Sequence, residues 1–235
     1  MKKIFFSFLC LLMLGLSGCF KQSDYIATFK TEPAIFTYYL FVFPAIETRG
    51  GMVLAPELEN EPLYSGNLLW VDFQINYDKQ PYSDVVTATI LNYQKIYSTD
   101  TMTGRVDEMT EDGYDAPIDY LFPEIKFIGK MMFLWFGHIA PKEQTYEYKM
   151  FYDPNDPSEI QTLYVKAQKT NEVTDSNIEL TTCFGFDLTS FIDRYEFTDK
   201  QSFQYTVKYC IGTKNGFDEY KSIEYSPRTW RISTD

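Results

Sequence analysis

The sequence is poor in the residues on which most catalytic and metal sites depend. Its 235 residues include a single histidine, His138, and four cysteines, none of them paired at a spacing typical of zinc ligands. We therefore expect no zinc site, no histidine-based catalysis and no cofactor. Basic residues are also scarce, because 21 Lys and Arg stand against 33 Asp and Glu. Since non-specific affinity for nucleic acid depends on Lys and Arg, no nucleic-acid partner is expected.

Apolar and aromatic residues, by contrast, are abundant. Hydrophobic residues make up 45% of the chain and aromatic residues 18%, including 20 Phe and 19 Tyr. This composition excludes a polar, disordered chain, because such a chain cannot bury enough apolar surface to fold. The length allows one or two domains.

The first eighteen residues have the features of a secretion signal. Lys2 and Lys3 precede a nearly unbroken apolar run, Ile4–Leu16, which small residues follow. A helix of this length is about 20 Å long, well short of the roughly 30 Å hydrocarbon layer of a bilayer. We expect residues 1–18 to be a signal peptide that is removed, and not a membrane-spanning anchor.

The residues at the end of this run resemble the bacterial lipobox, whose cysteine is acylated and becomes the first residue of the mature protein. The matching residues are Leu16-Ser17-Gly18-Cys19. The resemblance implies that acyl chains, palmitate included, hold the protein on the membrane through Cys19, with residues 19–25 as a tether. An ordinary signal peptide with an incidental cysteine is the alternative. Phe20 is not the aspartate associated with inner-membrane retention, so we expect the outer membrane, with the periplasmic or surface face left open.

The rest of the chain shows the patterns of β-strands. From Asn67 to Tyr77, apolar residues alternate with mostly polar ones, as in a strand with one buried face. The same alternation marks Asp84–Tyr97, whereas Met131–Phe136 is apolar on both faces, as expected of a strand covered on both sides. Turn signals such as Lys214-Asn215-Gly216 separate such segments, and no segment has a convincing long helical period. The predicted fold class is all-β.

An acidic segment with few bulky apolar residues, Thr99–Pro117, divides the strands into two groups. We interpret it as a linker or a long acidic loop. About five strands precede it and six or seven follow it, which suits a small barrel followed by a sandwich. The predicted domains therefore span residues 26–104 and 112–235.

The order of these features resembles that of the NigD-like lipoproteins of Bacteroidetes. The matching segments are the lipobox ending in Cys19, Ala27-Thr28-Phe29, Gly50-Gly51, Leu68–Tyr77, Val85–Tyr97, Ala116-Pro117-Ile118, Met131–Phe136 and Phe184–Leu188. The chain departs from the family at Val165–Lys169, where many members carry a more basic stretch. The resemblance implies an OB-like β-barrel domain followed by a C-terminal β-sandwich domain. Because the family is not defined by a known reaction, the resemblance implies a fold and a location but no activity.

Three groups of polar residues have simpler explanations than a catalytic or metal site. His138 has no orienting partner or nucleophile nearby in the sequence, so we expect a structural histidine at a strand end. Asp153, Asn155 and Asp156 loosely resemble a calcium loop, but turn geometry explains them and the glycine and glutamate of an EF-hand are missing. The carboxylates of Thr99–Pro117 could form a glycosidase-like pair, but acidic linkers are common. No catalytic residue and no metal ligand is predicted.

Aromatic residues at polar strand positions are the remaining candidates for a binding surface. Trp70 falls on an otherwise polar strand face, beside Asp72. Such a side chain can stack on a sugar ring or anchor a protein partner, so Trp70 is the candidate ligand contact. The favoured alternative is that it fills the contact between the two domains.

Cys183 and Cys210 are the cysteines that remain after Cys10 leaves with the signal and Cys19 is acylated. Each lies at the strand position opposite the bulky apolar residues, so the two could share a face. They are a candidate disulfide in an oxidising compartment, and two free thiols are the favoured alternative.

These features predict a non-catalytic lipoprotein of the outer membrane that acts as a binding or scaffolding module in the cell envelope. The expected partners are the membrane, through the lipid anchor, and an envelope protein or glycan that the sequence does not identify. Two alternatives remain: an envelope hydrolase with paired carboxylates, and a glycan-binding lipoprotein.

Overall fold

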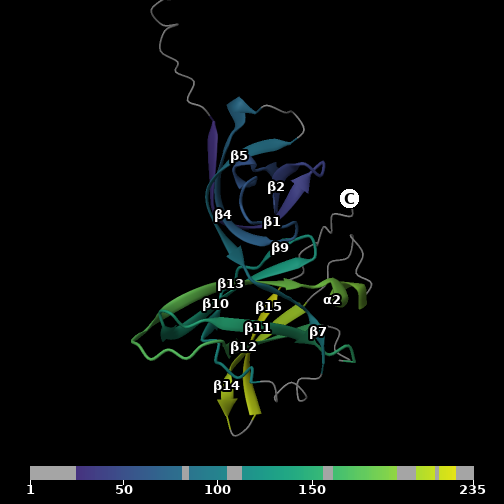
Figure 1. The fold of residues 1–235 in the computed structure, drawn as a ribbon. Helices are drawn as coiled ribbons and strands as arrows, with labels where there is room; N and C mark the ends of the chain where they lie inside the picture. Colours follow the sequence, from purple (N-terminus) through teal and green to yellow (C-terminus); the bar gives the residue numbers. More distant parts are fainter. Residues whose placement is uncertain are drawn as a thin grey trace, which may run out of the picture.

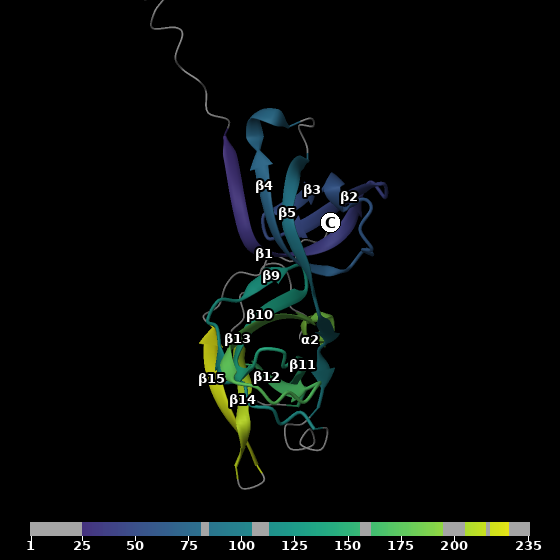
Figure 2. The ribbon, with the colours of Figure 1, turned by 60° about the vertical axis from the view of Figure 1, so that its left-hand side comes forward.

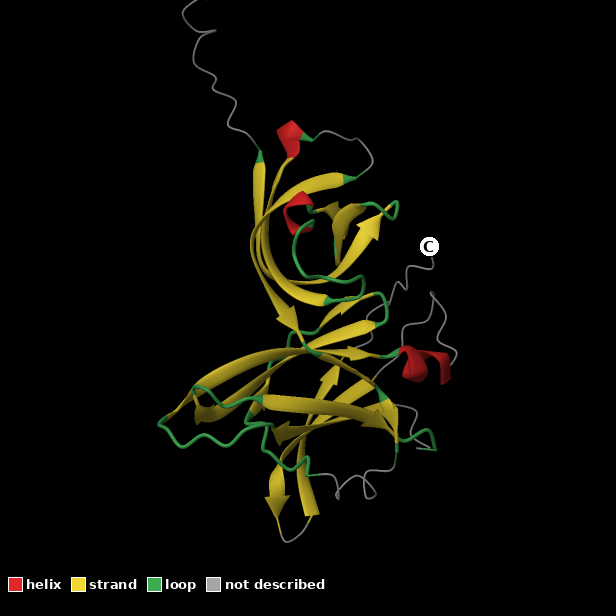
Figure 3. Cartoon of the chain, viewed as in Figure 1, coloured by secondary structure: helices red, strands yellow, loops and turns green. Residues whose placement is uncertain are grey.

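The computed structural model describes residues 25–80, 85–104, 113–155, 161–194, 205–214 and 217–225. Strands dominate it (Figure 3). A five-stranded barrel occupies one end of the molecule and two further five-stranded sheets occupy the other (Figure 1). This architecture confirms the predicted all-β class, with a small OB-like barrel followed by a sandwich. Among the described residues, no helix is both long and apolar enough to cross a bilayer.

The barrel is formed by the first five strands. They are β1 (Ile26–Tyr39), β2 (Phe43–Thr48), β3 (Gly51–Leu54), β4 (Leu68–Asn76) and β5 (Val86–Ile96), with short 3-10 helices at Pro56–Leu58 and Tyr77–Lys79. The barrel closes in the order β1-β2-β3-β5-β4, and β3 and β5 pair in parallel. The alternation seen in the sequence places Leu69, Val71, Phe73 and Ile75 of β4 in the barrel core. Because one face of β4 must be buried, the register in which β4 pairs with its neighbours is fixed.

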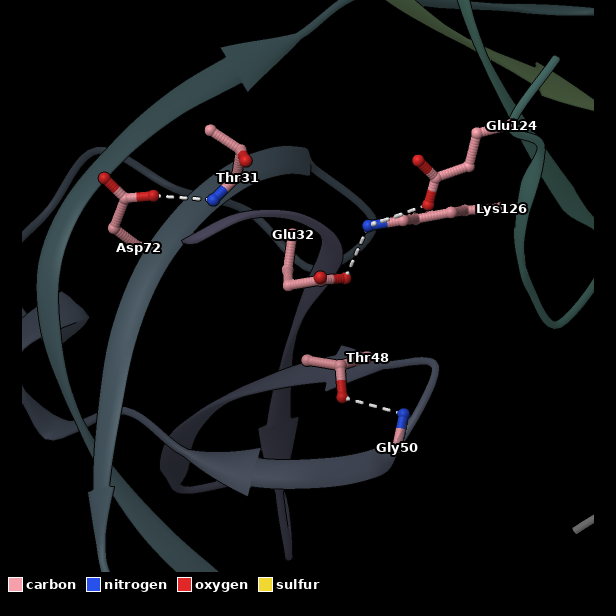
Figure 4. Close-up of polar contacts among 7 residues, drawn as sticks. All are labelled: Thr31, Glu32, Thr48, Gly50, Asp72, Glu124 and Lys126. Carbon is pink, nitrogen blue, oxygen red and sulfur yellow. Dashed lines mark hydrogen bonds and ion pairs between the residues drawn. The ribbon is translucent and has the colours of Figure 1, made fainter. Parts of the chain in front are cut away.

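Strand β1 serves both halves of the barrel because it bends in the middle. Residues 26–35 pair with β4 and residues 35–39 pair with β2, and the register with β4 shifts between Phe29 and Glu32. At the bend, Thr31 has a φ of 52°, and its backbone N–H donates to Asp72 Oδ1 at 2.6 Å (Figure 4). As a result, β1 starts at the barrel end remote from the sandwich, passes close to the sandwich and rises again toward β2 (Figures 1 and 2).

The sandwich consists of two sheets that enclose one core. The first contains β6 (Ser98–Asp100), β13 (Asn177–Asp187), β10 (Met131–Pro141), β8 (Tyr120–Leu121) and β9 (Lys126–Ile128). The second contains β15 (Phe217–Tyr225), β14 (Tyr205–Lys214), β12 (Gln161–Lys169), β11 (Tyr146–Tyr152) and β7 (Met102–Thr103). The helix α2 (Thr189–Arg194) adds Phe191 and Ile192 to the core between the sheets.

The described ends of the acidic segment pair with strands of the sandwich, whereas residues 105–112 lie outside the described residues. Residues 98–100 pair with β13 and residues 102–103 pair with β11, so the chain enters both sandwich sheets directly after the barrel. Ala116 forms a bridge with Ala167 of β12. Pairing with the sandwich therefore begins directly after Tyr97. Acidic composition did not prevent pairing, because strand pairing uses backbone groups and leaves polar side chains free to face water.

Candidate functional site

The contact between barrel and sandwich is a packed apolar surface, which we call the junction. Its buried members are Leu68 and Ile96 from the barrel and Ile128, Phe133 and Cys183 from the sandwich; Ile35, Trp70, Met131 and Trp135 pack around them. Gly185 is essential to this packing, because a Cβ atom at that position would lie 2.4 Å from Leu68 Cδ1. The missing side chain lets the barrel rest directly on strand β13.

Trp70, the candidate ligand contact, is part of the junction. Its ring packs edge to face against Trp135 of β10, with 5.9 Å between the ring centroids. Aromatic pairs in this geometry stabilise a contact by about 0.5–1.5 kcal/mol beyond the area they bury. The structure thus places the partly buried Trp70 in the contact between barrel and sandwich, where the domain-contact alternative puts it.

Polar contacts reinforce the junction on one side. Lys126 Nζ lies 2.9 Å from Glu32 Oε2 of the barrel and 3.7 Å from Glu124 Oε1 (Figure 4). The same ammonium group lies 5.7 Å from the centroid of the Trp135 ring. The backbone also crosses the junction, since the N–H of Gly185 donates to Tyr97 O at 3.0 Å. Side chains and backbone together therefore join barrel and sandwich.

The two predicted disulfide partners are buried, form no disulfide and lie on different faces of the molecule. Cys183 faces the barrel from the outer face of the first sheet. On β14, Tyr205, Val207 and Tyr209 point into the sandwich core, so Cys210 lies on the outer face of the second sheet. Packed sheets lie about 10 Å apart, beyond the roughly 7 Å between Cα atoms that a disulfide tolerates. Both cysteines do lie opposite the bulky apolar residues of their strands, as predicted, but they lie on the outer faces of two different sheets.

His138 is a structural residue. It is 1% exposed, its ring stacks on Tyr146 with 3.8 Å between centroids, and both ring nitrogens have partners. Nδ1 lies 2.9 Å from Pro117 O and therefore donates, while Nε2 accepts from the Tyr148 hydroxyl at 2.7 Å. Burial lowers the pKa of His138 from its usual 6.5, and the Pro117 carbonyl opposes this shift only in part. The imidazole is neutral and sealed from solvent.

The segment that loosely resembles a calcium loop has turn geometry, as the sequence analysis favoured. The backbone N–H of Asn155 donates to Asp153 Oδ1 at 2.9 Å, which is the hydrogen bond of an Asx turn. Asp156 lies outside the described residues, as do residues 105–112 of the acidic segment and the lipid attachment site, Cys19. Within the described ranges, no three His, Cys, Asp or Glu residues are grouped so that they could hold a metal ion.

Among the described residues, exposed apolar side chains gather at the turn between β1 and β2 and at the first residue of β2; we call this segment, Leu40–Phe43, the hairpin tip. Phe41 is 97% exposed, Val42 68% and Leu40 64%. The turn is closed by the N–H of Val42, which donates to Tyr39 O at 3.2 Å. OB-fold barrels use the loop in this position to contact ligands.

The backbone of the hairpin tip is strained. Leu40 and Phe41 have φ values of 49° and 63°, the left-handed region in which turns of this kind place Asn and Gly. Each such residue costs about 1–2 kcal/mol, and a nearly fully exposed Phe41 regains little of this by packing. Bulky apolar side chains at strained, solvent-facing positions indicate a function outside the fold itself.

Two signals in the sequence point to this surface, although the strand patterns alone did not reveal it. The chain carries no charged residue from Pro33 to Ile46. The middle of this run also lacks the Asn or Gly that a tight hairpin favours, so the sequence of Ile35–Phe43 is also compatible with one buried strand. Only the fold shows that the run contains a turn that leaves the barrel.

No protein-family model matches the sequence, and no curated protein matches it either. Solved structures do match. An uncharacterized protein from Parabacteroides merdae is 17% identical, with a TM-score of 0.69, over 83% of this chain and 98% of its own. A predicted lipoprotein from Bacteroides fragilis is 11% identical, with a TM-score of 0.63, over 87% of this chain and 98% of its own.

A NigD-like immunity protein from Bacteroides caccae has the same architecture. It is 13% identical to this chain and has a TM-score of 0.54, over 88% of this chain and 99% of its own. These similarities span barrel and sandwich alike, and they confirm the resemblance inferred from the sequence at the level of the fold. The chain therefore has the two-part all-β fold of a NigD-like protein of Bacteroidetes.

Proposed function

We propose that the protein is a lipid-anchored, non-catalytic scaffold of the outer membrane that holds its sandwich in a fixed position to bind an envelope protein or glycan. The observation that carries this proposal is the packed junction. A flexible linker would leave two independent binding modules, whereas the junction joins barrel and sandwich through Leu68, Gly185 and the Trp70–Trp135 pair. A rigid body keeps the orientation of its binding surface, so a partner does not have to order it on binding.

The entry of the chain into the sandwich supports the same role. Directly after β5, residues 98–100 pair with the first sheet and residues 102–103 with the second. Thr101 between them is buried, and its backbone N–H donates to Asp187 O at 3.0 Å. Hinge motion at this point would break backbone hydrogen bonds in both sheets, which is costly when the groups stay buried.

The start of β1 supports attachment through the barrel. Five residues separate Cys19 from Tyr25, and the six residue-to-residue steps span at most about 20 Å. Because β1 begins at the barrel end remote from the sandwich, this tether keeps the barrel near the bilayer and the sandwich away from it (Figure 1). The lipobox and the Bacteroides fragilis lipoprotein of the same fold support acylation, and Phe20 supports the outer membrane.

The surroundings of His138 support a non-catalytic role. Its ring nitrogens are both hydrogen-bonded inside the protein, so the imidazole is not available as a general base. Carboxylates would be the remaining acid and base groups of an enzyme built on this chain.

Cys19→Ala tests the anchor. The variant is expected to leave the membrane fraction or to accumulate as a precursor, while the wild-type protein stays in outer-membrane vesicles. Unchanged membrane attachment of the variant would contradict acylation at Cys19.

Capture from the native envelope tests the scaffold. A flexible insertion of about six Gly and Ser residues after Tyr97 should uncouple the sandwich from the barrel and weaken capture of the envelope partner. The same insertion at the exposed Gly50-Gly51 turn is the matched control and should leave capture unchanged. Equal capture by both variants would refute a rigid scaffold. Turnover of an envelope polysaccharide or peptide, abolished by one carboxylate substitution, would refute the non-catalytic role.

A further inference from the structure

The geometry points to a second membrane contact: the hairpin tip, Leu40–Phe43, inserts into the apolar boundary of the bilayer to which Cys19 is anchored. This contact goes beyond the scaffold role and rests on the acylation of Cys19 proposed above. The lipid anchor would hold the protein on the membrane, and the hairpin tip would fix how the barrel is oriented on it.

The hairpin becomes more polar with distance from its tip, as expected of a segment that enters a membrane interface. Leu40, Phe41 and Val42 form an exposed apolar tip. Behind them lie exposed tyrosines, Tyr38 on β1 and Tyr64 on the neighbouring loop. Tyrosine is enriched where the hydrocarbon layer meets the headgroups, because its ring is apolar and its hydroxyl remains hydrated. The first charged residues, Glu32 and Glu47, come only at the ends of the uncharged run.

Tyr64 is held beside the hairpin by its own loop. The N–H of Gly66 donates to Phe36 O at 2.8 Å, and the N–H of Phe36 donates to Asn67 O at 2.8 Å. The hydroxyls of Ser65 and Thr37 lie 3.5 Å apart. These contacts fix Tyr64 next to the outer end of β1, on the same side of the barrel as the hairpin tip.

The composition of the tip fits lipid better than a protein partner. Binding hot spots of protein interfaces are enriched in Trp, Tyr and Arg, and Leu and Val are under-represented. Leu, Val and Phe are residues that transfer favourably into the bilayer. A single convex turn is also small compared with the roughly 800 Å² that each partner buries in a stable protein complex. As an addition to an existing lipid anchor, however, a small apolar contact is enough.

The position of the hairpin allows both contacts at once. The tether from Cys19 to Tyr25 keeps the barrel within about 20 Å of the acyl chains. The hairpin leaves the barrel clear of the sandwich (Figures 1 and 2). Because no Lys or Arg occurs between Thr31 and Thr48, insertion would depend on apolar contact and not on attraction to anionic headgroups.

Vesicle partition tests the hairpin without the acyl chains. The mature chain with Cys19→Ala is mixed with phosphatidylcholine vesicles, and the bound fraction is measured by sedimentation. We expect weak binding that is insensitive to salt, and a decrease in the partition coefficient of at least about tenfold for Phe41→Ser. Ile139→Ser is the matched control, because Ile139 is a 61% exposed residue of the sandwich. It should leave the partition coefficient unchanged.

A depth measurement tests the acylated protein. A fluorophore on Phe41→Cys should be quenched by brominated lipid in reconstituted vesicles, whereas the same fluorophore on Ile139→Cys should not be. Cys183 and Cys210 are buried and should remain unlabelled. Equal quenching at both positions would overturn the proposal. Equal vesicle binding by the Cys19→Ala protein with and without Phe41→Ser would overturn it as well.

Two further results would also overturn it: crosslinking of position 41 to a protein in place of lipid, and a dimer in solution that Phe41→Ser dissolves. Neither result would affect the scaffold, which is tested by the insertion after Tyr97. Conversely, a flexible junction would leave the vesicle result unchanged.

Discussion

Gly185→Ala should weaken the junction by a steric overlap that the structure defines. The new Cβ would lie 2.4 Å from Leu68 Cδ1, whereas carbon atoms in contact are about 3.5–4.0 Å apart. Leu68 is buried, so its side chain can move away only by displacing its neighbours in the junction. Overpacking of this kind costs about 1–3 kcal/mol of unfolding free energy. Urea unfolding followed by tryptophan fluorescence measures it, because Trp70 and Trp135 report on the junction.

A double-mutant cycle separates this overlap from a general loss of stability. Leu68→Ala alone should cost about 2–5 kcal/mol, and adding Gly185→Ala should cost little more, because the clashing methyl group is gone. Gly50→Ala is the control and should be nearly neutral, since its Cβ would lie 3.6 Å from Thr48 Oγ1, an ordinary contact. If Gly185→Ala were harmless, or equally costly with and without Leu68, the junction would not be packed as described.

Three other predictions concern single sites. Replacing Leu40 and Phe41 by Asn and Gly should raise the free energy of unfolding by about 1–2 kcal/mol in urea titrations, because the new residues tolerate positive φ; a loss of stability would contradict strain in the hairpin tip. Cys183 and Cys210 should resist alkylation in the native protein, because burial raises the pKa of Cys183, and both should react after denaturation without reductant; a mass lacking both adducts would indicate a disulfide. The imidazole of His138 should titrate below pH 6.5 in NMR spectra, because burial lowers its pKa. Since the unfolded chain then binds more protons, the contribution of His138 to stability is complete above pH 6.5 and falls by up to about 1.4 kcal/mol per pH unit as the pH drops toward the folded-state pKa. An imidazole that titrates at or above 6.5 would contradict its burial.

Much of the fold follows from local patterns. The alternation in residues 67–77 predicts a strand with one buried face, and β4 has that face in the barrel core. The apolar residues of Met131–Phe136 predict cover on both faces, and β10 packs against the sandwich core on one side and the barrel on the other. These predictions succeed because the two-residue period of a strand is a local property of the chain.

The candidate site could not be predicted in the same way. The face of a strand on which a residue lies can be derived from the sequence, but what covers that face cannot. Trp70 and Cys183 both lie on faces that would be exposed in an isolated domain, and both are covered because barrel and sandwich pack together. Cys210 lies at an equivalent position on the other sheet, where no route to Cys183 exists.

The sequence by itself determined the strand content, the barrel-then-sandwich order and the features of a lipid anchor, because each depends on residues close together in the chain. The tertiary structure decided which apolar residues remain exposed. Trp70, chosen for its polar surroundings in sequence, is packed in the junction, whereas Phe41, within an apolar run that suggested burial, is 97% exposed. The physical reason is that burial depends on contacts between segments far apart in sequence, such as Leu68 with Gly185, and these exist only once the chain has folded.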